Sequence, residues 1–549
     1  MLRKKSAKLC SLLLAVTLGV TLFSGCGKEK ANTTNVEQKL TFSIADPKSI
    51  DPALNAAVDG STVIVNAFEG LMKLDEKDKA IPGVAEKYEM SKDGLTYTFH
   101  LRKDAKWSDG KAVTANDFEY AWKRALNPDT AAEYAYQMYY VKNGEAYNNK
   151  KAKVEDVGVK AKDASTLEVT LEAPTLYFLE LMAFPTYMPV RQDVVEKNKD
   201  WAIKPETYIC NGAFKMKEWK PKDVIVFEKN TNYYDASKIK LTSLSYKLLE
   251  DQNALLNGFN TGQLDVIQGP PQDQIPSLVK SGKAKIFPQV GTYFYCINVS
   301  PEAAKINPEA AKALGDARVR KALTLAINRK DIVESVAKGG QIPAAAWVSV
   351  GLFDAKGKEF KKEYYKPEGD IAEAKKLLAE AGYPDGKNFP KFTLMYNTGA
   401  GHESIAAAVQ EMWKQNLGIT GMELKNQEFK VFQKTRQDKQ YSIARHGWLG
   451  DYTDPMTFMD MWVTGGGNND AGYSNAKYDE KVNGAKKETD PAKRMTLMRE
   501  AEDILMEDMP IIPIYHYTVV SCIKPNVKGV RLSPLGQTYF QNVTIEAAK

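Results

Sequence analysis

Two hydrophobic periodicities are mixed along this chain, and the mixture constrains its fold more than any other feature. The stretches LTYTFHL (95–101) and STLEVTL (165–171) alternate apolar and polar residues, a period-2 pattern that predicts half-buried strands. Amphipathic spacing predicts three long helices: from Asp370 to Gly382, from Asp316 to the paired glycines 339–340, and from Pro491 to the residue before Pro510. Because strict strand–helix–strand alternation is lacking, we expect α+β or mixed α/β lobes rather than a barrel.

The length of 549 residues allows a sizeable core and about three domains. Hydrophobic residues make up 43% and charged residues 26%. This composition is typical of a globular protein and excludes a disordered, collagen-like or polytopic membrane chain.

The first 25 residues have the features of an export signal. Four basic residues lie within the first eight positions, and the uncharged run Leu9–Phe23 that follows is too short for a membrane span. The stretch LFSGC then ends at Cys26, with the small residue Gly25 that bacterial lipoproteins have before their lipidated cysteine. We therefore predict a lipoprotein signal peptide over 1–25, lipidation of Cys26 and a flexible polar tether over 26–37. A plain secretory signal cleaved nearby is the alternative.

The export segment also accounts for most of the net charge. Without its four basic residues the formal charge falls from +6 to +2. A nearly neutral mature protein gives no reason to expect nucleic-acid binding.

A search for catalytic and metal-binding motifs finds little. None of the four histidines belongs to an HExxH zinc motif, no serine lies in GxSxG, and no Gly-Lys pair has the spacing of a phosphate-binding loop. The glycines from Gly465 fail the dinucleotide pattern, because Asp470 occupies the third glycine position. Beyond Cys26 the cysteines are Cys210, Cys296 and Cys522, too widely spaced for a disulfide framework or a CxxC site. We expect no cofactor, no metal and no bond chemistry.

Five stretches resemble the oligopeptide-binding proteins of ABC importers, which are extracytoplasmic solute-binding proteins: GVAEKYEMSKDGLTYTFHLRKDAKWSDGKAVTANDFEYAWKRAL, CNGAF, DARVRKALTLAINR, AKKLLAEAGYPDG and ARHGWLGDYTDP. The resemblance implies two hinged α/β lobes with an extra domain inserted in the first and a ligand in the cleft between them. Lobe one would comprise 38–80, 208–305 and 515–549, the extra domain 81–207, and lobe two 306–514. The resemblance also implies a monomeric receptor, lipid-anchored to the outer face of the cell membrane, that passes peptides to a permease driven by separate ATPase subunits.

The resemblance assigns the two ends of a bound peptide to opposite charges. Asp451 matches the aspartate that binds the peptide α-ammonium, and Arg445, His402 and Lys338 match cations that anchor its carboxylate. A carboxylate and an ammonium about 4 Å apart attract by about 4 kcal/mol at an effective dielectric near ~20, before desolvation. We expect YSIARHGW to be a strand that carries Arg445 to a lobe edge, with Gly447 to Asp451 turning back across the cleft.

The remaining matched positions concern the middle of the peptide. Gly447 and Val58 would offer backbone groups to an extended chain, as in strand addition, which gives low sequence specificity. The residues matched to side-chain pockets are Trp448, Phe429, Arg436 and Tyr134. An acidic residue of the family falls at Ala56 here, so we expect a less acidic pocket at that position.

Each assignment has a structural alternative. Asp451 could cap its own turn, Arg445 could form a salt bridge at a strand end, and Trp448 and Phe429 could belong to the core. Two other functions also remain open: a solute-binding protein for a non-peptide ligand such as a metal chelate or a sugar, and a surface hydrolase.

Overall fold

The computed structural model describes residues 36–354, 356–399 and 401–547, and Glu37–Lys549 form one compact unit. The predicted signal peptide, its lipidation residue Cys26 and most of the tether lie outside the described residues. Within the described ranges, no helix combines the length and the apolar run that a membrane span requires.

A mixed sheet of eleven strands runs through the unit. Ten of its strands lie in the order β15 (Met422–Gln427), β14 (Phe392–Asn397), β16 (Ile443–Leu449), β12 (Ala284–Ile297), β17 (Ile511–Ile523), β11 (Val266–Gln268), β1 (Lys39–Ile44), β10 (Ser243–Leu248), β9 (Val224–Lys229) and β8 (Phe214–Lys220), and β13 (Ile342–Pro343) pairs with β17. The two long central strands, β12 and β17, therefore join segments predicted as lobe one to segments predicted as lobe two.

Period-2 alternation makes β12 part of two hydrophobic cores. Tyr293 and Tyr295 pack in the cluster that contains Leu323, Leu378 and Val409, whereas Phe294 and Cys296 pack in the larger cluster, which includes both Leu40 and Leu505. Successive side chains of a strand point to opposite faces, so one strand can serve both clusters. The two cores are thus linked by a shared strand.

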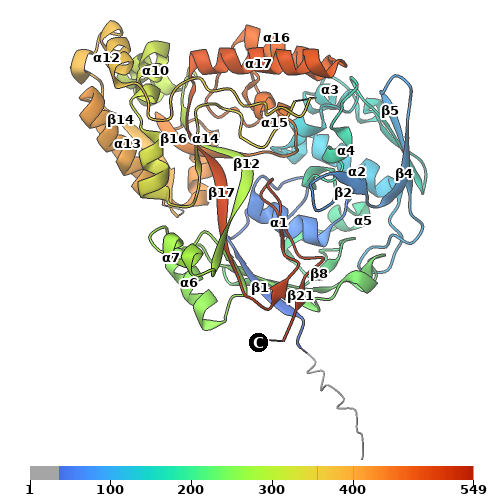
Figure 1. The fold of residues 1–549 in the computed structure, drawn as a ribbon. Coiled ribbons are helices and arrows are strands. Elements are labelled where there is room, and N and C mark those ends of the chain that lie inside the picture. Colours follow the sequence, from blue (N-terminus) through green and yellow to red (C-terminus); the bar gives the residue numbers. More distant parts are fainter. Residues whose placement is uncertain (1–35, 355, 400, 548–549) are drawn as a thin grey trace, which may run out of the picture. The chain divides into compact units, whose positions relative to one another are not determined.

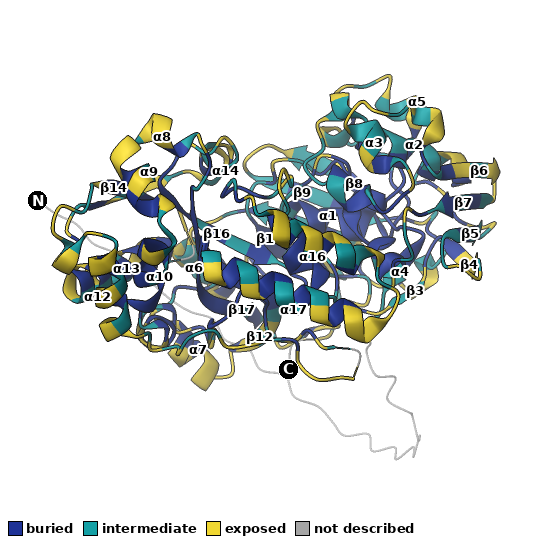
Figure 2. Ribbon diagram, turned by 90° about the horizontal axis from the view of Figure 1, so that it is seen from above, coloured by how far each residue is buried: buried dark blue, intermediate teal, exposed yellow. Residues whose placement is uncertain are grey.

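Helices surround this sheet: α1 (Val58–Ala67), α2 (Ala115–Leu126), α3 (Gly144–Asn148), α4 (Phe178–Leu181), α5 (Gln192–Val195), α6 (Gln252–Thr261), α7 (Ile275–Lys280), α8 (Ala303–Ile306), α9 (Pro308–Gly315), α10 (Ala317–Leu325), α11 (Arg329–Asp331), α12 (Ile371–Glu380), α13 (His402–Leu417), α14 (Phe429–Gln437), α15 (Met456–Met459), α16 (Ala476–Lys487) and α17 (Pro491–Asp508). Helices α10, α12 and α13 lie on one side of β12 and β17, and α2 lies on the other (Figure 1). Helix α1 is almost wholly buried, whereas α12 and α17 expose their outer faces (Figure 2).

A separate antiparallel sheet lies within the predicted inserted domain. Its order is β4 (Ala85–Met90), β5 (Thr96–Leu101), β7 (Thr166–Thr170) and β6 (Val159–Asp163). Alternate residues of β5 and β7 are buried, as the period-2 pattern predicts. Three two-stranded ribbons complete the strands: β2 (Met72–Leu74) with β3 (Ala80–Pro82), β18 (Val527–Lys528) with β21 (Thr544–Ile545), and β19 (Arg531–Leu532) with β20 (Thr538–Tyr539).

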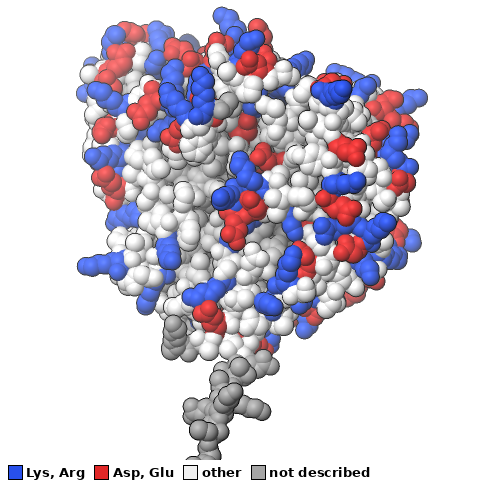
Figure 3. Space-filling model, turned by 45° about the vertical axis from the view of Figure 1, so that its right-hand side comes forward, with Lys and Arg blue, Asp and Glu red and all other residues white. Residues whose placement is uncertain are grey.

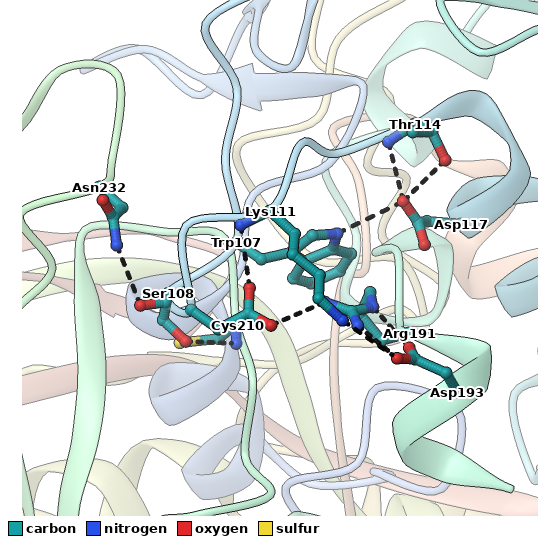
Figure 4. Close-up of polar contacts among 10 residues, drawn as sticks. Trp107, Ser108, Lys111, Thr114, Asp117, Arg191, Asp193, Cys210 and Asn232 are labelled. Carbon is teal, nitrogen blue, oxygen red and sulfur yellow. Dashed lines mark hydrogen bonds and ion pairs between the residues drawn. The ribbon is translucent and has the colours of Figure 1, made fainter.

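The loop WSDGK, part of the longest stretch that carries the family resemblance, has a structural role (Figure 4). Trp107 Nε1 donates to Asp117 Oδ2 at 3.3 Å, next to the N-terminal cap of α2. Asn232 Nδ2 donates to the carbonyl oxygen of Ser108 at 3.0 Å, a bond between the predicted inserted domain and predicted lobe one. These contacts fix the inserted domain in place.

Two of the three predicted long helices are confirmed. Asp370 caps α12 by accepting from Glu373 N at 3.0 Å, and α17 begins at Pro491 as expected. The third prediction, one continuous helix from Asp316 to the paired glycines, is wrong. The chain leaves the helix after α10, and Asn328 starts α11 by accepting from Asp331 N at 3.2 Å. A side chain that competes for backbone groups favours such a new cap over helix continuation.

The three cysteines among the described residues, Cys210, Cys296 and Cys522, are buried free thiols. Burial raises the pKa of each, to about 12 for Cys210 and Cys296 and to about 11 for Cys522. On the surface, basic and acidic side chains are interspersed (Figure 3), in agreement with the small net charge calculated without the signal segment.

Candidate functional site

A cavity of about 330 Å³ lies between the segments predicted as the two lobes and the inserted domain. Eight of the ten ligand residues predicted from the sequence line it: Val58, Tyr134, Phe429, Arg436, Arg445, Gly447, Trp448 and Asp451. They come from α1, the inserted domain, α14 and β16, which are far apart in the sequence. The fold therefore brings these residues together, although their roles in binding remain predictions.

Asp451 is a carboxylate without a cation. Its Oδ2 accepts from Gln137 Nε2 at 2.5 Å and its Oδ1 from Tyr134 OH at 3.5 Å, and no Lys, Arg or His among the described residues forms an ion pair with it. Burial raises the pKa of Asp451 from 3.8 to about 8, and these hydrogen bonds offset only part of the effect. These contacts differ from the alternative in which Asp451 caps its own turn, because both hydrogen-bond donors, Gln137 and Tyr134, lie in the predicted inserted domain.

Arg445 is a guanidinium without an anion. Its Nη2 donates to Tyr517 OH at 2.8 Å, and its Cζ lies 4.8 Å from the centre of the Tyr293 ring. Its buried Nε has no hydrogen-bond partner, and no carboxylate among residues 36–547, gaps aside, pairs with it. The strand-end salt bridge considered from the sequence is therefore absent among the described residues, and Arg445 and Asp451 line the cavity as unpaired charges of opposite sign.

The other charged groups near β16 are internally paired. Arg436 Nε lies 2.5 Å from Asp470 Oδ2, and the same oxygen lies 3.3 Å from His446 Nε2. Burial and the nearby Arg436 lower the pKa of His446 to about 4, so this histidine is neutral at physiological pH. Arg436 thus lines the cavity with its charge already compensated by Asp470.

Two predicted carboxylate anchors do not line the cavity. His402, at the start of α13, is only 4% exposed, and its Nδ1 lies 3.2 Å from Tyr293 OH. Burial, together with the Arg445 charge, holds the pKa of His402 well below its ordinary value, so it carries no positive charge there. Lys338 is exposed, in a left-handed conformation after the π-helical turn Ile332–Ala337. In this arrangement Arg445 alone offers the cavity an unpaired cation among the described residues.

The strand prediction for YSIARHGW is confirmed, but the turn begins later than expected. Strand β16 continues to Leu449, so Gly447 and Trp448 are strand residues and the turn starts at Gly450. Pairing with β12 holds the chain extended through Leu449. Trp448 is 5% exposed, and its Nε1 donates to the carbonyl of Thr457 at 2.9 Å. Trp448 therefore both packs in the core and lines the cavity.

One edge of β16 is open beside the cavity. Strand β14 pairs with β16 only at Ile443 and Ala444, so the edge from Arg445 to Leu449 has no paired strand on that side among the described residues. A Cβ at Gly447 would lie 2.2 Å from Tyr517 OH, so a side chain there requires Tyr517 to move. Glycine therefore lets Tyr517 approach the open edge closely.

Several residues of the site were not found from the sequence. Gln137, 314 positions from Asp451, is 1% exposed and leaves its Oε1 without a partner. Tyr136 accepts from Asn468 Nδ2 at 2.9 Å and lies in the same cluster. No local motif marks these residues, since their only common feature is proximity in the fold.

Among the described residues, no group of three or more His, Cys, Asp or Glu side chains is arranged to hold a metal ion. The cavity lining includes Ser61, whose hydroxyl oxygen accepts from Asn55 Nδ2 at 2.8 Å, and His446, which faces Asp470; among the described residues no hydrogen bond joins this serine to this histidine, as nucleophilic catalysis would need. The chemistry of the cavity is that of unpaired charges of both signs beside an open strand edge.

Comparisons with known proteins agree with this arrangement. Residues 79–470 match the family model described as "Bacterial extracellular solute-binding proteins, family 5 Middle". The chain is 41% identical to the oligopeptide-binding protein OppA of Bacillus subtilis (strain 168), over 98% of this chain and 99% of that protein.

Solved structures add information on the conformation. Haemophilus influenzae OppA in complex with the peptide RPPGFSPFR superposes with a TM-score of 0.85 at 33% identity, covering 93% of this chain and 99% of that one. The murein tripeptide binding protein MppA of Escherichia coli gives 0.84 at 34% identity, covering 93% and 98%. The unliganded open form of MppA gives only 0.65 at the same identity, covering 93% and 97%. The present lobe arrangement thus differs from that open form.

Proposed function

The chain belongs to the bacterial extracellular solute-binding proteins of family 5, and from this premise we propose that it captures oligopeptides with free termini in an extended conformation and delivers them to an ABC permease. Its fold is the two-lobed mixed α/β fold of the periplasmic peptide-binding proteins. The peptide would occupy the cavity between the lobes.

One observation carries the proposal: the unpaired Asp451 and Arg445 line the same cavity. An α-ammonium beside Asp451 and an α-carboxylate beside Arg445 would each replace lost hydration with a charge-assisted hydrogen bond. A buried charge without a partner destabilises a protein by several kcal/mol. Removing one partner of a buried ion pair, for example, costs roughly 3–5 kcal/mol. A zwitterionic chain removes both costs at once.

The open edge of β16 explains how a peptide can bind regardless of its sequence. The backbone of an extended chain would pair with Arg445 to Leu449 in the manner of an added strand. These bonds involve groups that every residue possesses, so we expect weak selection by side chain along this edge.

The cellular arrangement follows from the same proposal. We propose that the export segment is removed, that Cys26 carries the lipid that anchors the protein to the outer face of the cell membrane, and that the protein acts as a monomer. The permease and its ATPase subunits are other chains. No nucleic acid is involved.

A neutral sugar would leave Asp451 and Arg445 buried without partners, so the cavity does not favour it. Members of this family are solute-binding proteins rather than enzymes. The proposal therefore assigns no bond chemistry to the protein.

The test has two steps. Denaturing mass spectrometry of the purified protein would identify peptides that are released from the cleft. Calorimetry would then compare one such peptide with the same peptide acetylated at its amino terminus. We expect the acetylated form to bind at least tenfold more weakly, and equal affinities would refute the assigned role of Asp451.

A further inference from the structure

The ionisable side chains that line the cavity do not balance. They are Asp59, Glu133, Arg436, Arg445, Asp451 and the neutral His446. Glu133 pairs with Lys48 at 2.8 Å and Arg436 with Asp470, both partners lying outside the cavity lining. Three charges remain unpaired, namely Arg445, Asp451 and Asp59, with a net charge of one negative when all are ionised.

Asp59 lies in the first turn of α1, next to Val58. Its Oδ1 accepts from Ala45 N at 3.1 Å, which ties the end of β1 to this helix. No Lys, Arg or His among the described residues forms an ion pair with Asp59, and Oδ2 has no hydrogen-bond partner there. The structural role of the carboxylate thus accounts for one of its two oxygens.

The surroundings of Asp59 supply no spare cation. Glu250, Glu428 and Asp46 lie in the same region, where the charge of Glu250 acts on Asp59, and those of Glu428 and Asp46 act on Glu250. The one lysine there, Lys430, pairs with Asp46 at 3.2 Å. Burial and Glu250 together raise the pKa of Asp59 to about 6, which shows that its charge is poorly compensated.

We propose that Asp59 is a specificity-determining residue that binds a lysine or arginine side chain of the peptide. The inference rests on the proposed function, because the free termini of a peptide are taken to satisfy Asp451 and Arg445. A zwitterionic peptide with only neutral side chains leaves Asp59 without a partner. A peptide with one basic side chain in reach neutralises all three groups, and the half-buried Asp59 carboxylate gains a charge-assisted hydrogen bond from that pairing.

This selection acts in addition to the sequence-independent backbone pairing. Ala56 had suggested a pocket with less acidic character, but Asp59 places a carboxylate in the same cavity three positions further along the chain. Selection for charge should be confined to one peptide position, because Asp59 has a single place on the cavity wall.

Calorimetry with a lysine scan tests the proposal. The probes are tetrapeptides of alanine with free termini, in which lysine or glutamine replaces each residue in turn. We expect lysine at one position to bind at least tenfold more tightly than glutamine there, and the two to bind within about twofold elsewhere. This comparison uses the unaltered protein, so it does not depend on the folding of any variant.

Variants then assign the effect. Asp59→Asn keeps an oxygen that accepts from Ala45 N, and it should abolish the lysine preference, so that the lysine and glutamine peptides bind within about twofold of each other at every position. The matched control Glu250→Gln removes a neighbouring charge that does not line the cavity, and the lysine preference should persist. Thermal unfolding of each variant confirms that it is folded.

Three results would overturn the inference. Equal affinity for lysine and glutamine at every position, with clear binding of all peptides, would refute the role of Asp59 alone. A lysine preference that survives in Asp59→Asn would do the same. Failure of every tetrapeptide and of the co-purified peptides to bind would refute the proposed function, and this inference with it.

Discussion

Replacing Asp451 by asparagine should make the empty protein close more readily and bind peptides less well. In the present arrangement the pKa of Asp451 is about 8 instead of 3.8. Bringing the lobes together at pH 7 therefore requires the carboxyl to take up a proton, at a cost of up to about 4 kcal/mol. In the variant this cost is replaced by the loss of hydration of the asparagine amide on closure, which costs about 1–3 kcal/mol. The variant should thus gain about 1–3 kcal/mol toward closure, a rise of roughly tenfold to hundredfold in the ratio of closed to open molecules.

The same substitution removes the partner of the peptide α-ammonium. We expect affinity for a free peptide to fall by at least about tenfold, because the lost charge-assisted contact outweighs the easier closure. Affinity for the acetylated peptide should rise, because the variant closes more readily and this peptide has no α-ammonium whose contact with Asp451 could be lost. The opposite signs distinguish this account from a general loss of folding.

Pulsed electron spin resonance between one label on α12 and one on β4 would measure closure. In the free wild-type protein at pH 7 we expect mainly the long distance, and in free Asp451→Asn a larger share of the short one. At pH 5 the two proteins should differ less, because the wild-type carboxyl is then protonated more cheaply. Identical distance distributions at pH 7, or an unchanged affinity for the free peptide, would refute the reasoning.

Three further predictions follow from the same cavity. Because the pKa of Asp451 in the closed state lies above its value of 3.8 in the open state, the carboxyl destabilises the empty closed state as pH rises from about 4 to about 8. A bound ammonium keeps Asp451 ionised, as it is in the open protein at pH 7, so peptide binding at pH 7 should release no net proton from Asp451; calorimetry in buffers of different ionisation enthalpy measures this, and release of about one proton would contradict it. For a peptide long enough to reach Arg445, we expect the wild-type protein to prefer a free carboxyl terminus over an amidated one by roughly tenfold or more, and Arg445→Met should remove this preference. A preference that persists in the variant would assign the peptide carboxylate to another site. Gly447→Ala should weaken all peptides several-fold by displacing Tyr517, and the double variant with Tyr517→Phe should recover part of the loss; a lack of any effect would show that this strand edge is not used.

The sequence allowed the strand that carries the site to be predicted, together with eight of the residues that line the cavity. Arg445 and Asp451 lie six positions apart on one segment, so a single strand and its turn place them together. Gln137 could not be found in this way, because it meets Asp451 only through the packing of the inserted domain. Asp59 was passed over because one acidic residue in a helix has no distinctive pattern until its lack of a cation is visible.

The error in the helix prediction has a physical cause. The helix predicted from Asp316 was taken as continuous because its apolar spacing continues, but Asn328 offers a cap and Arg329 is buried against backbone carbonyls, with Nε donating to Pro513 O at 2.7 Å. Tertiary contacts there override a preference that is correct for the isolated segment. The anchoring role of His402, which was assigned from the family resemblance, stays a prediction, and burial lowers the pKa of this histidine.

Two polar contacts between the predicted lobes and the inserted domain are weaker than the charges that the cavity leaves unpaired. Lys430 and Asp46 lie 3.2 Å apart with side chains 47% and 28% exposed, and Gln437 donates to Glu133 at 2.7 Å. An exposed pair of this kind contributes about 0–1 kcal/mol. These two contacts do not offset about 4 kcal/mol for Asp451 at pH 7, to which Arg445 and Asp59 add. A ligand that supplies the missing charges therefore favours closure, and moving the equilibrium from 1:99 to 99:1 needs about 5.5 kcal/mol of differential binding. Two or three buried ion pairs supply energies of that order, so the unpaired charges both select the ligand and make closure depend on it.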